Sequence, residues 1–153
     1  MHNACSQSVT WEWKLLFRQT HPHYLTPATK WLSVNPTDPT NDNYSILNTL
    51  GDECKNENGK FLFHLKWPKA SGGGNNYNKW RQSTNPVTEK VKVVGYEAVD
   101  VHHTGSHWGG LENSFLHRGS SPHALLDGSV NSGITHATSR LTLARSPSEA
   151  YYI

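Results

Sequence analysis

Residues 10–19 read TWEWKLLFRQ, with hydrophobic and polar side chains in alternation. Because successive side chains of a strand point to opposite faces, this period of two predicts a half-buried β-strand with Trp11, Trp13, Leu15 and Phe17 on one face. Residues 60–67, KFLFHLKW, repeat the pattern. Pro68 is expected to close this second strand, because proline cannot donate to a β-ladder.

Further strands are predicted downstream. A longer β-run is expected over residues 88–103, with a bulge or bend at Gly95, and weaker strands are expected over residues 124–130 and 134–143. The large hydrophobic residues of the stronger strands are expected to share one core. They are Trp11, Trp13, Phe17, Phe61, Phe63, Leu65, Val91, Val93, Val99 and Val101.

The segments between these strands are rich in Asn, Gly, Pro and Ser, which indicates loops at residues 35–44, 70–78 and 105–122. Helix is expected only at residues 45–52. Strands joined by long polar loops, without β-α-β alternation, favour an all-β antiparallel β-sandwich of jelly-roll type. The whole chain, residues 1–153, is expected to form a single domain, in which residues 117–153 have the least defined packing.

Composition argues against several classes of partner. A formal net charge of +2, with 17% charged residues, gives no electrostatic signature for nucleic acid. We expect no membrane span, and residues 1–10 lack the apolar segment of a signal peptide.

The richness in Trp, Asn, Gly and Ser favours an extracellular protein. There, Cys5 and Cys54 would form the one disulfide that two cysteines allow, although two buried thiols fit the sequence equally well. Asn43-Tyr44-Ser45 is the one N-glycosylation sequon.

The loop at residues 35–44 carries a cluster of oxygen-bearing side chains, Asp38, Asn41, Asp42 and Asn43. Hard oxygen ligands at close spacing are typical of calcium sites, although the glycine and terminal glutamate of an EF-hand loop are missing. The alternative is a run of Asx turns, in which the same side chains accept hydrogen bonds from the local backbone.

The order of an aromatic strand at residues 11–19, an Asp/Asn loop and a downstream cysteine at Cys54 resembles secreted fibrinogen-related lectin domains. The resemblance covers about a third of the chain. It implies a calcium loop beside a ligand pocket, and hence a carbohydrate-binding function in the extracellular space.

Residues 71–86 combine a glycine run with aromatic and amide side chains. Sugar sites use this mixture, because a ring stacks on the apolar face of a pyranose while amides bind its hydroxyls. The alternative is that Trp80 covers the end of the sandwich while the amides only solvate the loop. The candidate ligand-binding residues are Asn75, Asn76, Tyr77, Asn78, Trp80 and Gln82.

Three histidines, His102, His103 and His107, surround a short turn that contains Gly105. If this turn closes a hairpin, His103 and His107 face each other and could share zinc or copper, while His102 points to the other face. A third ligand would come from His64, Asp100, Glu112 or His117. Solvated loop histidines are the simpler interpretation.

Neither cysteine lies in a recognisable nucleophile motif, and no Gly-x-Ser-x-Gly elbow occurs. Three functions therefore compete. The first is an extracellular, lectin-like module that binds a glycan or a matrix ligand. The second is a zinc- or copper-dependent enzyme or metal-binding domain, and the third is a structural or assembly domain. The oligomeric state does not follow from the sequence.

Overall fold

The computed structural model describes residues 14–19, 28–68, 75–104, 107–113, 125–127 and 148–152. Most elements in these ranges are strands. The strands are β1 (Lys14–Gln19), β2 (Tyr44–Ser45), β3 (Phe61–Pro68), β4 (Asn75–Gln82), β5 (Glu97–Val101), β6 (Glu112–Asn113), β7 (Leu126–Asp127) and β8 (Ser148–Tyr152). Short 3-10 helices, η1 (Ala28–Leu32), η2 (Leu47–Thr49) and η3 (Asp52–Cys54), complete the described elements, and none of these is an α-helix.

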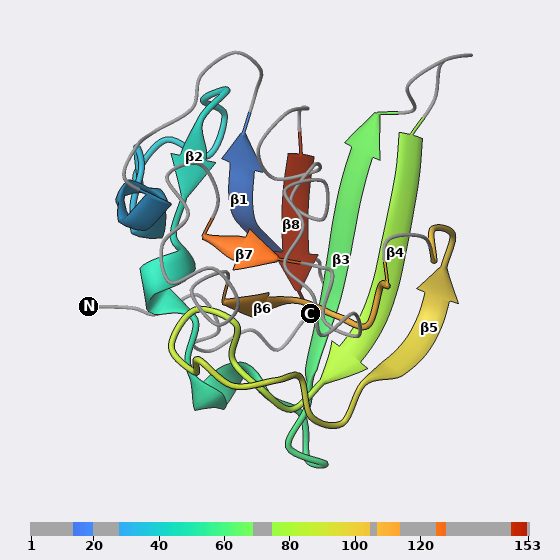
Figure 1. Cartoon of the computed structure of the whole chain (residues 1–153). Helices are drawn as coiled ribbons and strands as arrows, with labels where there is room; N and C mark the ends of the chain where they lie inside the picture. Colours follow the sequence, from blue (N-terminus) through green and yellow to red (C-terminus); the bar gives the residue numbers. More distant parts are fainter. Residues whose placement is uncertain are drawn as a thin grey trace.

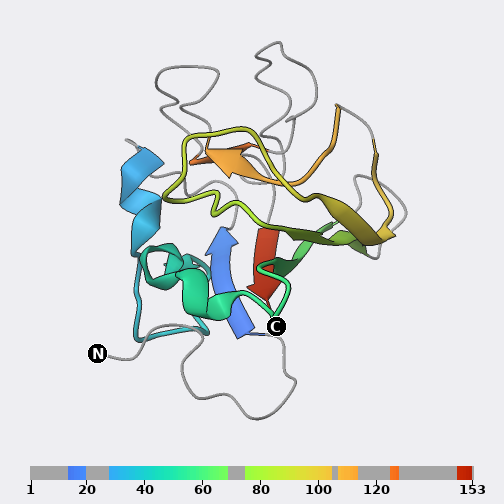
Figure 2. The same cartoon turned by 90° about the horizontal axis from the view of Figure 1, so that it is seen from below.

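Six strands form one antiparallel sheet in the order β2-β1-β8-β3-β4-β5 (Figure 1). The strands β2 and β5 therefore lie at opposite edges of this sheet. The strands β6 and β7 form a separate antiparallel pair. This pair runs across the strands of the large sheet and forms a second layer in front of it (Figures 1 and 2). The expectation of an all-β, antiparallel protein is confirmed.

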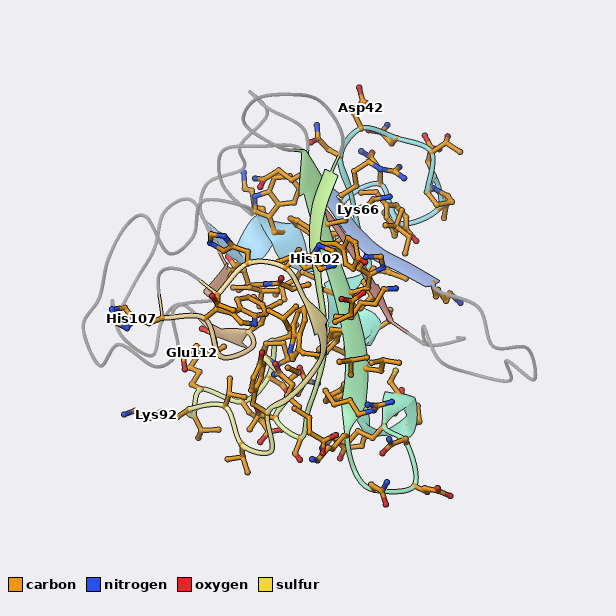
Figure 3. All side chains as sticks on the ribbon, turned by 90° about the vertical axis from the view of Figure 1, so that its right-hand side faces the viewer. Asp42, Lys66, Lys92, His102, His107 and Glu112 are labelled. Carbon is orange, nitrogen blue, oxygen red and sulfur yellow. The ribbon has the colours of Figure 1, made fainter. Side chains whose placement is uncertain are left out.

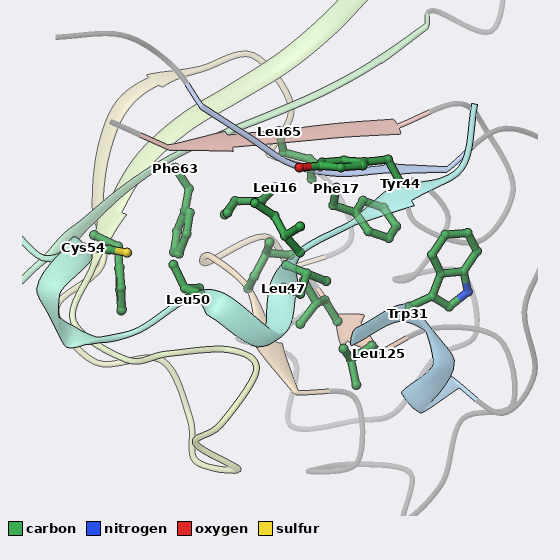
Figure 4. Close-up of a cluster of buried hydrophobic side chains, with 14 of the residues drawn as sticks. Leu16, Phe17, Trp31, Tyr44, Leu47, Leu50, Cys54, Phe63, Leu65 and Leu125 are labelled. Atoms are coloured by element: carbon green, nitrogen blue, oxygen red, sulfur yellow. The ribbon is translucent and has the colours of Figure 1, made fainter. Parts of the chain in front are cut away.

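The core lies between the large sheet and this second layer. The inward side chains of β1 and β3 meet leucines of the η2 region and Leu125 (Figure 4). Among the residues whose burial the structure describes, the buried hydrophobic ones are Leu16, Phe17, Trp31, Tyr44, Ile46, Leu47, Leu50, Cys54, Phe61, Phe63, Leu65, Trp80, Leu111, Leu125 and Leu126. The predicted core positions Phe17, Phe61, Phe63 and Leu65 are confirmed, and Trp11 and Trp13 lie outside the described residues.

The first strand departs from simple alternation. The register shifts between Leu15 and Phe17, so that Leu16 is an extra residue opposite β8. A β-bulge of this kind turns two successive side chains toward one face. Leu16 and Phe17 are both buried, whereas Leu15 packs only partly against the core.

The predicted long strand over residues 88–103 is wrong, because β5 comprises only Glu97–Val101. Val91 and Val99 are exposed, at 47% and 45%, and Val93 and Val101 are partly buried. Val99 is exposed because the register of β5 shifts opposite Lys79 and Trp80, which leaves Val99 as the extra residue of a bulge. The expected bend at Gly95 is confirmed by its φ of +74°.

Two other expectations from composition are wrong. Residues 75–78 belong to β4, which pairs with β3 from Phe61↔Gln82 to Pro68↔Asn75, and not to a loop. The predicted helix at residues 45–52 is replaced by the end of β2 and the short helices η2 and η3. The predicted strand over residues 124–130 contains β7, and the one over residues 134–143 lies outside the described residues.

Candidate functional site

The site begins with the two faces of β4. Asn78, Trp80 and Gln82 point into the core and are completely buried. Tyr77, Lys79 and Arg81, which alternate with them, are partly exposed on the opposite side of the sheet. The neighbouring strands add their own outward side chains in register. We call this surface the outer face, and it consists of Leu62, His64, Lys66, Tyr77, Lys79, Arg81, Glu97, Asp100 and His102.

Three side chains of the outer face form one cluster at the end of β5. The Tyr77 hydroxyl donates to Oδ2 of Asp100 at 2.7 Å, and Nε2 of His102 lies 3.1 Å from Oδ1 of the same carboxylate. The rings of Tyr77 and His102 have centroids 4.0 Å apart. We call Tyr77, Asp100 and His102 the Tyr-Asp-His cluster. Its carboxylate and imidazole remain accessible, with side-chain exposures of 46% and 42%.

Basic side chains surround this cluster. Nζ of Lys79 lies 5.1 Å from the centroid of the Tyr77 ring, and the ring of His64 contacts the same tyrosine edge-on at 5.3 Å. The hydrogen bond from Tyr77, with the charges of His102 and Lys79, lowers the pKa of Asp100 below its usual range. The same hydrogen bond raises the pKa of Tyr77, because it stabilises the protonated hydroxyl. Asp100 is therefore held as an anion with a protonated phenol beside it.

The buried amide of Asn78 fixes the backbone that carries the cluster. Its Oδ1 accepts hydrogen bonds from the backbone N–H groups of His102 and His103, both at 2.9 Å. Its Nδ2 donates to the carbonyl of His103 at 3.0 Å. Since a buried amide with these partners has little freedom to rotate, Asn78 holds the chain where it leaves β5 and aims His102 at Asp100.

The buried amide of Gln82 plays a similar role at the other end of β4. Its Oε1 accepts from Nε1 of Trp80 at 2.7 Å and from the N–H of Leu111 at 2.9 Å. Its Nε2 donates to the carbonyls of Thr84 and Leu111, at 2.8 and 2.9 Å. Gly110 allows this approach, because its φ is +102° and a Cβ there would lie 2.7 Å from Oε1 of Gln82. Gln82 therefore joins β4 to the chain that leads into β6.

The six ligand-binding residues predicted from the sequence thus divide between two environments. Asn78, Trp80 and Gln82 are buried structural residues, whereas Tyr77 reaches the outer face. Asn75 and Asn76 lie at the start of β4. The structure brings Tyr77 together with Asp100 and His102, and the sequence does not predict this grouping.

The hairpin predicted to bring His103 opposite His107 is not formed in the described residues. Among the described strands, β5 lies at the edge of the sheet and pairs with β4 alone, and His107 is exposed with a φ of +60°. Figure 3 shows His107 well apart from His102. His102 lies beside Asp100 on the outer face. Within the described ranges, no group of three or more His, Cys, Asp or Glu side chains is arranged to hold a metal ion.

The loop at residues 35–43, with Asp42 at its outer side in Figure 3, is held by its own hydrogen bonds. Oδ1 of Asp38 accepts from the hydroxyl of Thr40 at 2.7 Å, which lowers the pKa of Asp38, and Oδ1 of Asn41 accepts from the N–H of Asn43. Nη1 of Arg18 donates to the carbonyls of Pro39 and Asn41, at 2.6 and 3.1 Å. A guanidinium from β1 therefore supplies positive charge to this loop, and the loop forms Asx turns.

Two further findings bear on the environment of the protein. Cys54 is disulfide-bonded, and Cys5, the one other cysteine of the sequence, lies outside the described residues. No helix among the described segments is long and apolar enough to cross a membrane.

In comparisons with known proteins, no family model, no curated protein and no solved structure matches this chain.

Proposed function

We propose that this protein is an extracellular, lectin-like binding module that takes a carbohydrate on the outer face, at the Tyr-Asp-His cluster. The observation that carries the proposal is a half-exposed carboxylate and imidazole beside an aromatic ring, with the backbone of His102 held by the buried amide of Asn78. Binding groups that are ordered before the ligand arrives cost less entropy on association.

The chemistry of the cluster suits a hydroxyl-rich ligand. An ionised carboxylate has about four lone-pair sites, and Tyr77 and His102 occupy one each on Asp100, so that sugar hydroxyls can donate to the others. The second imidazole nitrogen of His102 can accept a hydrogen bond from a sugar hydroxyl, and the ammonium of Lys79 can donate one to a hydroxyl oxygen. The partly exposed rings of Tyr77 and His64, which contact each other edge-on, add aromatic carbon surface beside the carboxylate.

The charge of the outer face also favours a carbohydrate over a polyanion. Its cations, Lys66, Lys79 and Arg81, are interspersed with the carboxylates of Glu97 and Asp100. Glu97 is paired with Lys60 at 2.6 Å, a contact that lowers its pKa. Nucleic acids need a surface of one sign, because their affinity depends on neutralising many phosphates. A surface with charges of both signs instead offers donors and acceptors for separate hydrogen bonds to the hydroxyls of a carbohydrate.

The disulfide at Cys54 supports an extracellular location, because structural disulfides persist in oxidising compartments. We also propose that the chain folds as a jelly-roll-like β-sandwich. Its support is the second layer of β6 and β7, which lies across the six-stranded sheet.

The test is a glycan array probed with the wild-type protein and two variants of β5, Asp100→Asn and Glu97→Gln. Both variants remove one carboxylate of the outer face, but only Asp100 belongs to the cluster. We expect wild type and Glu97→Gln to bind the same glycans, and Asp100→Asn to bind them about tenfold more weakly or worse, because a charge-assisted hydrogen bond contributes roughly 1.5–3 kcal/mol.

A wild-type protein that binds no glycan contradicts the proposal. So does an Asp100→Asn variant that binds as tightly as Glu97→Gln. Circular dichroism and thermal unfolding must show that both variants are folded, so that a loss of binding is not a loss of structure.

A further inference from the structure

The sequon Asn43-Tyr44-Ser45 lies where the exposed loop at residues 35–43 enters β2. N-glycosylation requires Asn-x-Ser/Thr, in which x is not proline. The same loop contains Asn35-Pro36-Thr37, which has the outer residues of a sequon but proline between them. The loop therefore offers one complete acceptor sequence beside one that proline blocks.

The backbone of Asn43 is held at the surface of the protein. Its N–H donates to Oδ1 of Asn41 at 2.9 Å, and its carbonyl accepts from Nδ2 of Asn35 at 2.8 Å. The residues that precede Asn43 in the loop are mostly exposed, and Asn43 itself is half-buried. Asn43 therefore lies at the boundary between the exposed loop and the buried strand.

The other two residues of the sequon are in a different environment. Tyr44 is 5% exposed and belongs to the core, and Ser45 is completely buried. The Ser45 hydroxyl donates to the carbonyl of Trp31 and accepts from the N–H of Leu47 at 3.3 Å. The backbone of Ser45 is bonded to Val34 in both directions. In the folded protein, no transferase can read the hydroxyl that defines the sequon.

We propose that Asn43 is N-glycosylated, and that the modification takes place before β2 joins the sheet. The co-reactant is a lipid-diphosphate-linked oligosaccharide. A bond forms between Nδ2 of Asn43 and the anomeric carbon of the sugar, and the bond from that carbon to the diphosphate oxygen breaks. The lipid diphosphate leaves with the electron pair, and the amide nitrogen loses one proton.

The place of Asn43 in the fold makes this modification compatible with the outer-face site. The strand β2 is one edge of the six-stranded sheet, and β5, which carries Asp100, is the other edge. A glycan at the β2 edge leaves the Tyr-Asp-His cluster open. The inference does not depend on what the outer face binds.

The first test expresses the full chain behind a cleavable secretion leader in animal cells and treats the product with peptide N-glycosidase. We expect a single shift in electrophoretic mobility, and mass spectrometry should find aspartate at position 43 after the treatment. Asn43→Gln should lose the shift, and Asn35→Gln should keep it. Pro36→Ala, which completes the blocked sequon, should gain a second glycan at Asn35. An unmodified Asn43 in a secreted chain overturns the proposal, most directly if Pro36→Ala acquires a glycan at Asn35 alone.

The second test concerns timing. The unglycosylated protein is purified from bacteria and incubated with a microsomal transferase and its lipid-linked donor, either folded or reduced and unfolded. We expect transfer to Asn43 only in the unfolded chain. Transfer to the folded protein at the same rate would overturn the inference that glycosylation precedes the docking of β2.

Discussion

The two faces of β4 are both polar, yet they have opposite roles. The inward face carries Asn78 and Gln82 on either side of Trp80, and the nitrogen and the oxygen of both amides have hydrogen-bond partners inside the protein. The outward face carries Tyr77 and Lys79, which remain accessible. The comparison teaches that polarity alone does not mark a binding residue. What matters is whether the partners of a polar group are already supplied by the fold.

The largest effect should follow from truncating the inward face at its centre. Trp80→Ala should lower the free energy of unfolding by about 3–5 kcal/mol, because the side chain is fully buried and packs against Phe63 and Trp108. Denaturant unfolding measures this loss. The neighbouring outward residue provides the control, since Arg81→Ala should cost about 0.5 kcal/mol or less. Equal losses in the two variants would break the comparison.

A smaller effect is expected from Asn78→Ala. The N–H groups of His102 and His103 lose their common acceptor, which should cost roughly 1–3 kcal/mol. In addition, the variant should bind glycan more weakly without altering the outer face directly, because His102 is no longer held against Asp100. Asn48→Ala, at an exposed amide of η2, is the matched control and should change neither quantity. Unchanged glycan affinity in Asn78→Ala would show that the hydrogen bonds of Asn78 do not position the Tyr-Asp-His cluster.

The pH dependence of the outer face gives a subtler test. Because the pKa of Asp100 is lower in the folded state, its ionised form stabilises the fold at pH values above its unfolded pKa, about 3.9. This stabilisation is lost as the pH falls through the lower, folded-state pKa. Tyr77→Phe removes the hydrogen bond that lowers the pKa most, so the pKa of Asp100 should rise toward its ordinary value.

Carboxyl-detected NMR titration measures this shift. Tyr96→Phe is the control, because its hydroxyl accepts from Nε1 of Trp108 and does not contact Asp100. If the pKa of Asp100 is the same in wild type and Tyr77→Phe, the hydrogen bond is not what holds the carboxylate in its charged form.

The smallest expected effect concerns the loop at residues 35–43. Arg18 already provides a cation to the carbonyls of Pro39 and Asn41, so millimolar calcium should leave the melting temperature unchanged relative to a chelator. A calcium ion bound only to the native state would raise it by mass action. A clear rise would restore Asp38, Asn41, Asp42 and Asn43 as a metal site.

The sequence predicted what depends on hydrophobic alternation. Phe61, Phe63 and Leu65 were placed correctly in a strand and in the core, because apolar residues on every second position leave one buried face. The composition of β4 predicts a loop instead of a strand, because its inward residues, Asn78, Trp80 and Gln82, are mostly polar. Only tertiary partners, such as the backbone of His103 and Leu111, make such residues suitable for a core.

The candidate site was only partly predictable for the same reason. Tyr77 was recognised, but Asp100 and His102 join it through the pairing of β4 with β5, which places Lys79 opposite Asp100. The hairpin at Gly105 was inferred from turn composition alone, which carries no information about which strand lies next to β5.

The most direct measurement of the central claim is a two-dimensional NMR titration of the full chain with a glycan selected on the array. The account predicts that the largest chemical-shift changes occur at Tyr77, Lys79, Asp100 and His102, while the inward residues Asn78 and Gln82 change little at their side-chain amides. Changes concentrated at Asp38–Asn43, or spread evenly over the protein, would contradict the assignment of the outer face as the binding surface.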